Sequence, residues 1–297
     1  MTTNLETLLT ALYVLIDDHV IPAHGRQRGR PRKLSDAELV CLAVAQVLRG
    51  ARSEHHWLRI CHRELPGMFP YLPKQPGYHK RVKSAAPLIM KTQMLLARTG
   101  PGWSDEVKLI DATPIPCGTS RTTVRRSRLG DWAGYGYCAA HSRWYWGLKL
   151  YLVTSIEGIP IAWCLARPNI GEAEIAAELL AHARDQAMLP EQVWLIGDKG
   201  FDGRAWHRDL HELRILFARP DKKNETYAHG SLGGIRQRIE AIIATLKSQL
   251  NLEHHHGRTH HGVITRIAQR LLALTAAIWH NWTTNAPVLR SLTTYEQ

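Results

Sequence analysis

The chain has 297 residues, a formal net charge of +12 at neutral pH and an apolar fraction of 44%. This length supports a full hydrophobic core, and a basic excess of this size favours a polyanionic partner such as nucleic acid over a generic basic surface. Five cysteines without a CxxC pair exclude a disulfide framework and a zinc knuckle and indicate reduced thiols in the cytoplasm, and no apolar run is long enough to span a membrane.

Residues 1–100 are expected to form a helical module. Apolar residues at helical spacing predict helices over 5–18, 35–50, 53–63 and 83–98, and a capping box at Ser35–Glu38 opens the second of them. Scattered lysines and arginines favour a helix-turn-helix-like DNA-binding module over a helical dimerisation or packing domain.

A short basic segment follows the first predicted helix. Arg28, Gly29, Arg30 and Pro31 form an extended cationic element that resembles the core of an AT-hook, and Arg32 adds a further charge. Such an element fits the minor groove of DNA, where guanidinium groups meet a strong negative potential. A basic linker explains the same residues. Arg28, Arg30 and Arg32 are therefore candidate DNA contacts.

From residue 101 the pattern changes from helical to strand-forming. Apolar, aromatic and β-branched runs predict strands over 107–110, 144–154, 159–165, 193–196 and 214–218, with a hairpin between the second and third. Helices are predicted over 171–188, 202–213, 235–250 and 262–282. A hairpin followed by alternating strands and helices predicts an α/β fold in which a mixed β-sheet is flanked by helices.

Three acids stand where such a fold gathers ligand sites. Asp111 and Asp198 each follow a short apolar strand, and Glu240 is the single acid of the helix predicted over 235–250. Ligands commonly bind at strand ends of an open sheet, and two carboxylates at close range need a cation between them. Taken singly, each acid is more simply explained as a turn residue, a helix cap or half of a surface ion pair.

Together, the three carboxylates point to metal-assisted chemistry. Oxygen ligands suit a hard divalent cation such as Mg²⁺, or Mn²⁺ in its place. Three carboxylates are enough to hold two ions about 3.5–4 Å apart, and such a pair supports an in-line phosphoryl displacement. With a basic surface beside it, the expected substrate is a nucleic-acid phosphodiester.

Three motifs occur in a fixed order along the chain. The first is Ile110–Cys117, the second is Gly197–Asp202, and the third is the helix that carries Arg236, Glu240 and Lys247. Together they resemble the DDE transposases of bacterial insertion sequences over roughly residues 35–281. Many of those enzymes carry a Tyr-x2-Arg-x3-Glu-x6-Lys signature, whose tyrosine position is here taken by glycine.

The resemblance implies an RNase H-like catalytic core and specific roles for the acids and nearby bases. It implies that Asp111, Asp198 and Glu240 form the catalytic triad that binds two Mg²⁺ or Mn²⁺ ions. It also implies that Arg236 and Lys247 contact phosphates of the transposon end, with Lys149 and Lys199 as secondary candidates.

The resemblance implies a reaction and its partners. The enzyme would nick the ends of the element, and the freed 3′-hydroxyl would then attack target DNA. Its partners would be double-stranded DNA, namely terminal inverted repeats and target, and a second copy of the chain when assembled on DNA. The protein would be cytoplasmic in a bacterium, associated with the nucleoid when bound to DNA, and would not contact a membrane.

Three parts are expected along the chain. Residues 1–100 would be the N-terminal DNA-binding region, 101–252 the catalytic domain, and 253–297 a histidine-rich loop and a C-terminal helix packed on that domain. Two other functions stay open: a non-catalytic DNA-binding protein derived from a transposase, and a metal-dependent nuclease without strand transfer. The intact acids argue against the first, because negative charge beside DNA does not help a protein that only binds.

Overall fold

The structure is a computed structural model, and it describes residues 5–21, 32–138, 142–222, 232–288, 292 and 295. The chain divides into two compact units. The first comprises residues 1–100, 246–255 and 261–297, and the second comprises residues 101–245 and 256–260. All five cysteines are free. Within the described ranges, no helix is both long and apolar enough to cross a membrane.

All the regular secondary structure described in the first unit is helical. It contains α1 (Leu5–His19), α2 (Asp36–Leu48), α3 (Glu54–Glu64), α4 (Gln75–Ser84), α5 (Ala86–Thr99), the 3-10 helix η2 (Leu252–His254) and most of α10 (His260–Thr283). The predicted capping box is present between Ser35 and Glu38. The sequence predicted one helix over 83–98, whereas the chain forms α4 and α5, each with a proline in its first turn.

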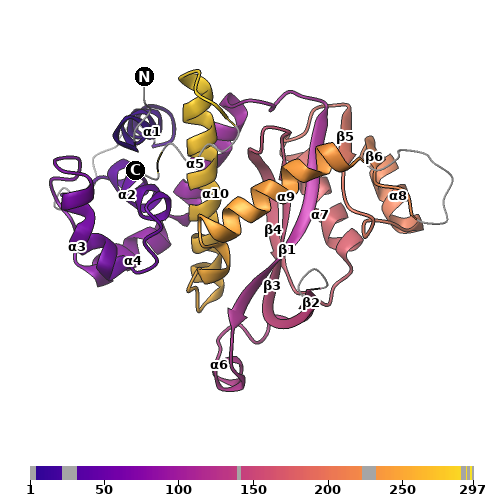
Figure 1. The fold of residues 1–297 in the computed structure, drawn as a ribbon, viewed down its shortest axis with the longest axis horizontal. Coiled ribbons are helices and arrows are strands. Elements are labelled where there is room, and N and C mark those ends of the chain that lie inside the picture. The colour runs from indigo at the N-terminus through magenta and orange to yellow at the C-terminus, as the bar shows by residue number, and fades with distance from the viewer. Residues whose placement is uncertain are drawn as a thin grey trace. The chain divides into compact units, whose positions relative to one another are not determined.

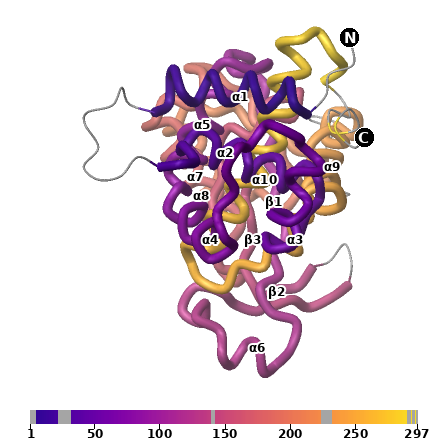
Figure 2. The backbone as a smooth tube through the Cα atoms, turned by 90° about the vertical axis from the view of Figure 1, so that its left-hand side faces the viewer, coloured from indigo at the N-terminus to yellow at the C-terminus, as the bar shows by residue number. Residues whose placement is uncertain are grey.

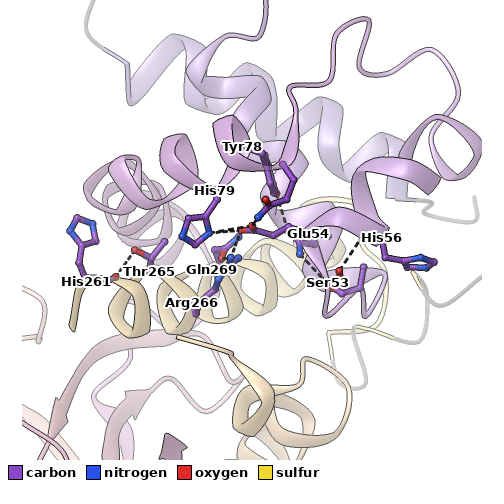
Figure 3. A network of polar contacts seen from close by, with 12 residues as sticks. Ser53, Glu54, His56, Tyr78, His79, His261, Thr265, Arg266 and Gln269 are labelled. Carbon is purple, nitrogen blue, oxygen red and sulfur yellow. Dashed lines mark hydrogen bonds and ion pairs between the residues drawn. The ribbon is translucent and has the colours of Figure 1, made fainter. Parts of the chain in front are cut away.

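A buried polar network joins helices of this unit (Figure 3). Glu54 of α3 is 8% exposed and pairs with Arg266 of α10. Gln75 donates a hydrogen bond to the same carboxylate at 2.8 Å, and a ring nitrogen of His79 lies 3.2 Å from it. Burial alone would raise the pKa of Glu54, but the charge and hydrogen bond of Arg266 lead the interactions that leave this pKa lowered. The buried pair therefore ties the C-terminal helix to α3.

The C-terminal helix belongs largely to the first unit. From His261 onward α10 groups with the N-terminal helices, while the expected packing of residues 253–297 on the catalytic domain stays a prediction. The buried residues of α10 include every position from Ile267 to Ile278. These positions lie on every side of the helix, whereas the apolar stripe in the sequence predicted only one covered face.

The second unit is an α/β domain with a six-stranded mixed sheet in its described part (Figure 1). The strands are β1 (Val107–Gly118), β2 (Gly134–Cys138), β3 (Arg143–Thr154), β4 (Pro160–Ala166), β5 (Val193–Ile196) and β6 (Ile215–Ala218). Their order is β2-β3-β1-β5-β6, and β4 pairs with β3. β5 runs parallel to β1 and β6, while β3 is antiparallel to its neighbours. The predicted mixed sheet flanked by helices is confirmed.

Helices cover both faces of this sheet (Figure 1). α7 (Glu172–Asp185) and α8 (Arg204–Glu212) pack on one face, in a cluster that contains Ile110. α9 (Gly233–Ser248) covers the other face, where Ile239 and Ile243 pack with Leu109 and Ile196. Successive residues of a strand point to opposite faces. The face of β1 that carries Leu109 is therefore the one that α9 covers.

β1 is longer than predicted, which changes the place of the first acid. The sequence predicted a strand over 107–110 closed by Asp111, whereas β1 continues to Gly118 and pairs with β3, with a register shift between Pro116 and Gly118. Only its first three residues pair with β5. Pro114 and Pro116 argued against a longer strand in the sequence, because proline has no N–H group to donate. Both lie where β1 pairs with β3 alone, so the open edge of β1 accommodates the missing N–H groups.

Gly147→Ala is expected to destabilise the second unit by about 3 kcal/mol, the upper part of the range for overpacking. A Cβ at Gly147 would overlap the carbonyl oxygen of Ile115 and lie 2.9 Å from the amide nitrogen of Cys117, so β1 and β3 would have to separate. Gly130→Ala is the matched control, because its added Cβ meets no atom within 4 Å. Urea unfolding measures both variants, and equal midpoints would contradict the close approach of the two strands.

Candidate active site

The parallel pairing of β1 and β5 brings two of the predicted acids to equivalent positions. Leu109 and Ile196 are partners at the end of this pairing, and Asp111 and Asp198 each stand two residues further along. Residues two apart on a strand share a face, so Asp111 lies on the side that Leu109 presents to α9. Because β1 and β5 are neighbours in the sheet, the two aspartates come to the same edge of the β1–β5 pair.

α9 brings the third acid and a base to the same side of the sheet. Ile239 and Ile243 anchor the helix on the sheet, and Glu240 stands beside the first of them. Arg236 Nη2 lies 3.2 Å from Asp198 Oδ1 and 3.2 Å from Glu240 Oε1. One guanidinium group thus binds two of the three predicted acids, and of these two contacts the one with Asp198 is not visible in the helical spacing.

Asp111 is partly buried beside this pair. Its Oδ1 accepts a hydrogen bond of 2.7 Å from the amide of Ala112. Burial raises the pKa of Asp111 to about 6, and the carboxylates of Asp198 and Glu240 act in the same direction, while Arg236 opposes them. A nearby cation would stabilise the ionised form of a carboxyl group that lies among other acids in this way.

The three acids have the donor chemistry of a hard cation, although they do not form a closed metal cage. Over the described parts of the chain, no group of three or more His, Cys, Asp and Glu side chains is close enough to hold an ion. Arg236 instead bridges Asp198 and Glu240. All the donors are carboxylate oxygens, which are the ligands that Mg²⁺ or Mn²⁺ prefers. The surroundings of Asp111 also raise its pKa.

Two predicted phosphate contacts, Lys149 and Lys199, differ in their position relative to the three acids. Lys149 is on the α7 face of β3, the side that carries Tyr151, and it pairs there with Glu172. The structure therefore does not bring Lys149 to the face that carries the acids. Lys199 is exposed and directly follows Asp198.

Two further predicted DNA contacts, Lys247 and Arg32, each pair with an acid of the first unit. Lys247 lies 3.4 Å from the carboxylate of Glu253. Arg32 lies 2.6 Å from Asp36, in a pair between exposed side chains. The two remaining candidates fall outside the described residues, namely Arg28 and Arg30.

Asp202, the second acid of the Gly197–Asp202 motif, binds basic residues of a different segment. It pairs with Lys222, lies 3.3 Å from Arg219 and accepts a 2.9 Å hydrogen bond from the amide of Gly203. Lys222 foremost holds the pKa of Asp202 far below its usual range. Its bases follow 17 and 20 residues later in the chain, too far for local spacing to reveal. Asp202 thus joins the segment after β6 to the start of α8.

Comparison with protein families adds an independent finding. Residues 102–276, more than half of the 297-residue chain, match the family described as "Transposase DDE domain". The matched range contains all six described strands and the three predicted acids. A comparison with curated proteins gave no match.

Proposed function

The chain belongs to the family of DDE transposases, and from this premise we propose that it cuts the ends of a transposable element and joins them to target DNA. Its mixed sheet between helices is the RNase H-like fold of such enzymes. One observation supports the proposal most. Asp111 and Asp198 stand at equivalent positions beyond the β1–β5 pairing, and Arg236 links Asp198 to Glu240.

In this proposal Asp111, Asp198 and Glu240 are the catalytic acids and together would hold two divalent cations, Mg²⁺ or Mn²⁺. Bound there, such ions would activate an attacking oxygen and stabilise a leaving one. The apolar contacts of α9 keep Glu240 on the sheet face that carries Asp111. Arg236 offsets part of the negative charge and is placed to bind a DNA phosphate, since a guanidinium group matches phosphate oxygens in a bidentate fashion.

The proposed reaction consists of two displacements at phosphorus. Water first attacks a phosphodiester at the end of the element, and the bond to the 3′-oxygen breaks to leave a free 3′-hydroxyl. That hydroxyl then loses its proton and attacks a phosphodiester of the target, so one P–O bond forms as another breaks. Because two ends must be joined, we propose that the enzyme assembles as a homodimer on DNA.

The test uses DNA that carries the inverted repeats flanking the coding region. With Mg²⁺ or Mn²⁺ the protein is expected to nick the repeat ends, and EDTA is expected to abolish nicking reversibly. DNA binding measured by fluorescence anisotropy should persist in EDTA, because neutralisation of phosphates by lysine and arginine needs no metal.

Each alternative function predicts a different result in this assay. Binding without cutting in every metal would favour a non-catalytic DNA-binding protein. Cutting without joining to a target would favour a metal-dependent nuclease.

A further inference from the structure

Part of the second unit extends beyond the strands that carry the acids. After Leu109, β1 has β3 as its only partner among the described strands, and β2 pairs with the first residues of β3. The helix α6 (Arg121–Arg125) follows β1 at this end of the sheet (Figures 1 and 2). We call residues 113–138 and 142–148 the arm. The sequence patterns predicted neither β2 nor α6.

The β2–β3 pair of the arm exposes three aromatic side chains on one face. Tyr135 is 58% exposed, Tyr137 is 50% exposed and Trp144 is 72% exposed. Tyr137 and Trp144 are cross-strand partners whose ring centroids lie 5.4 Å apart. Of the large apolar side chains that the structure describes, Trp144 is the most exposed. Rings of this size are usually buried, so a cluster of them at the surface indicates an interaction site.

The opposite face of β2 explains why these rings point outward. Glycines alternate with the tyrosines in Gly134–Cys138, and a Cβ on Gly136 would lie 2.6 Å from Pro168 and 2.8 Å from the ring of Tyr145. The absence of side chains thus lets Tyr145 and Pro168 lie directly against the backbone of β2. Strand alternation then directs both tyrosines to the solvent side.

Positive charge lies in the segment next to the rings. Four arginines of α6 and the following loop are exposed, and none forms an ion pair with any residue that the structure describes: Arg121, Arg125, Arg126 and Arg128. Arg143 at the start of β3 is also exposed, and Asp131 is the single acid of the arm. The arm is therefore strongly basic.

One packing contact places the arginines beside the aromatic face. A Cβ on Gly118 would lie 3.0 Å from the ring of Trp146 and 3.3 Å from the side chain of Val124. Trp146 shares its strand face with Trp144, because the two are separated by one residue. Val124 belongs to α6, so this helix borders the surface that continues into the exposed rings.

We propose that the arm binds unpaired nucleotides of a DNA strand, with Tyr137 and Trp144 stacking on bases and the arginines around α6 binding the adjacent phosphates. This inference rests on the proposed function only in taking DNA as the partner. Arginine next to exposed aromatic rings matches the alternating phosphates and bases of a single strand. A duplex hides the faces of its bases, so it would leave the rings without a partner.

Binding is measured in EDTA, so that no cutting occurs, with three labelled probes: an oligothymidine, an abasic strand of the same length and a duplex. Trp144→Leu is expected to weaken oligothymidine binding about tenfold or more, as for the loss of one stacked base. The affinities of Trp144→Leu for the abasic strand and the duplex should stay close to those of the wild type. Trp194→Leu is the matched control, since Trp194 is 40% exposed on β5 of the same unit.

Arginine variants test the other half of the proposal. Arg125→Gln with Arg126→Gln is expected to weaken binding of all three probes. It should also flatten the salt dependence of oligothymidine binding, with the slope falling by about 0.7 for each lost phosphate contact. Unchanged salt dependence would overturn the assignment of phosphate contacts to these residues.

Three results would overturn the stacking proposal. The first is equal affinity of Trp144→Leu and Trp194→Leu for oligothymidine. The second is an equal loss on the oligothymidine and the abasic strand. The third is a change in the sedimentation of Trp144→Leu without any change in its DNA binding, which would identify the exposed rings as a protein interface. If the protein binds oligothymidine through Trp144 but never nicks DNA, only the proposed function is contradicted. If the protein nicks DNA normally and Trp144→Leu leaves oligothymidine binding unchanged, only the proposal for the arm is contradicted.

Discussion

Asp111→Asn is expected to abolish cleavage and at the same time to stabilise the folded protein. A metal-assisted displacement derives several kcal/mol of transition-state stabilisation from its charged ligands. Loss of one ligand carboxylate should therefore lower the rate by about 1,000-fold or more. Nicking of repeat-end DNA in Mg²⁺ measures the loss, and anisotropy should show that the affinity for DNA is retained.

The gain in stability follows from the raised pKa of Asp111, which is about 6 in the folded protein against an ordinary value of 3.8. An acid whose pKa is raised by folding costs stability as the pH increases through the interval between these two values. Without metal, Asp111→Asn should unfold at a higher temperature than the wild type at pH 7.5, with a gain of about 1–3 kcal/mol. The difference should shrink as the pH falls through this interval and disappear below both pKa values, at about pH 3, where the aspartate is protonated in both states.

The control for both measurements is Asp185→Asn, because Asp185 is an exposed acid at the end of α7. It should change neither the nicking rate nor the unfolding temperature. If Asp111→Asn lost activity together with stability, the side chain would have a structural role. Cleavage within about tenfold of the wild type would exclude Asp111 as a metal ligand.

Arg266→Ala is expected to cause the largest loss of stability in the first unit. It would leave the buried carboxylate of Glu54 without its cation, and removing one partner of a buried ion pair costs about 3–5 kcal/mol. Adding Glu54→Gln to this variant should recover part of the loss, since the unpaired charge is then removed as well. Because the pKa of Glu54 is lowered from 4.5, its contribution in the wild type should be lost as the pH falls through that lowered value.

Arg63→Ala is the matched control, because Arg63 forms an exposed pair with Glu64 at 3.2 Å. Exposed pairs contribute about 1 kcal/mol or less. Guanidinium unfolding of both variants makes the comparison. Equal losses would contradict the burial of Glu54 as the cause.

The sequence predicted the strands and acids whose signals are local. β5 spans Val193–Ile196 as predicted, because four consecutive residues with a turn behind them define a short strand. The periodicity of α9 likewise identified Ile239 and Ile243 as its buried side. Gly233, which replaces the tyrosine of the signature, is the first residue of α9.

Features that depend on distant partners could not be predicted. Glu54 and Arg266 are 212 residues apart, so no local pattern assigns α10 to the N-terminal helices. The bridge from Arg236 to Asp198 requires the helix to be placed on the sheet first. β2 escaped notice because one face of the strand is made largely of glycine, which carries no hydrophobic signal.

The β1–β5 pairing also determines which parts of this chain are free to vary. The described chain forms three strands and two helices between β1 and β5, yet the relation of Asp111 to Asp198 is set by strand register and not by the length of that intervening chain. Insertions in the connections would leave the two carboxylates together, whereas one extra residue inside β1 ahead of Asp111 would turn its side chain to the α7 face. The arm lies between Asp111 and Asp198 in the chain, so changes of its length or sequence leave the β1–β5 pairing of the two carboxylates unchanged.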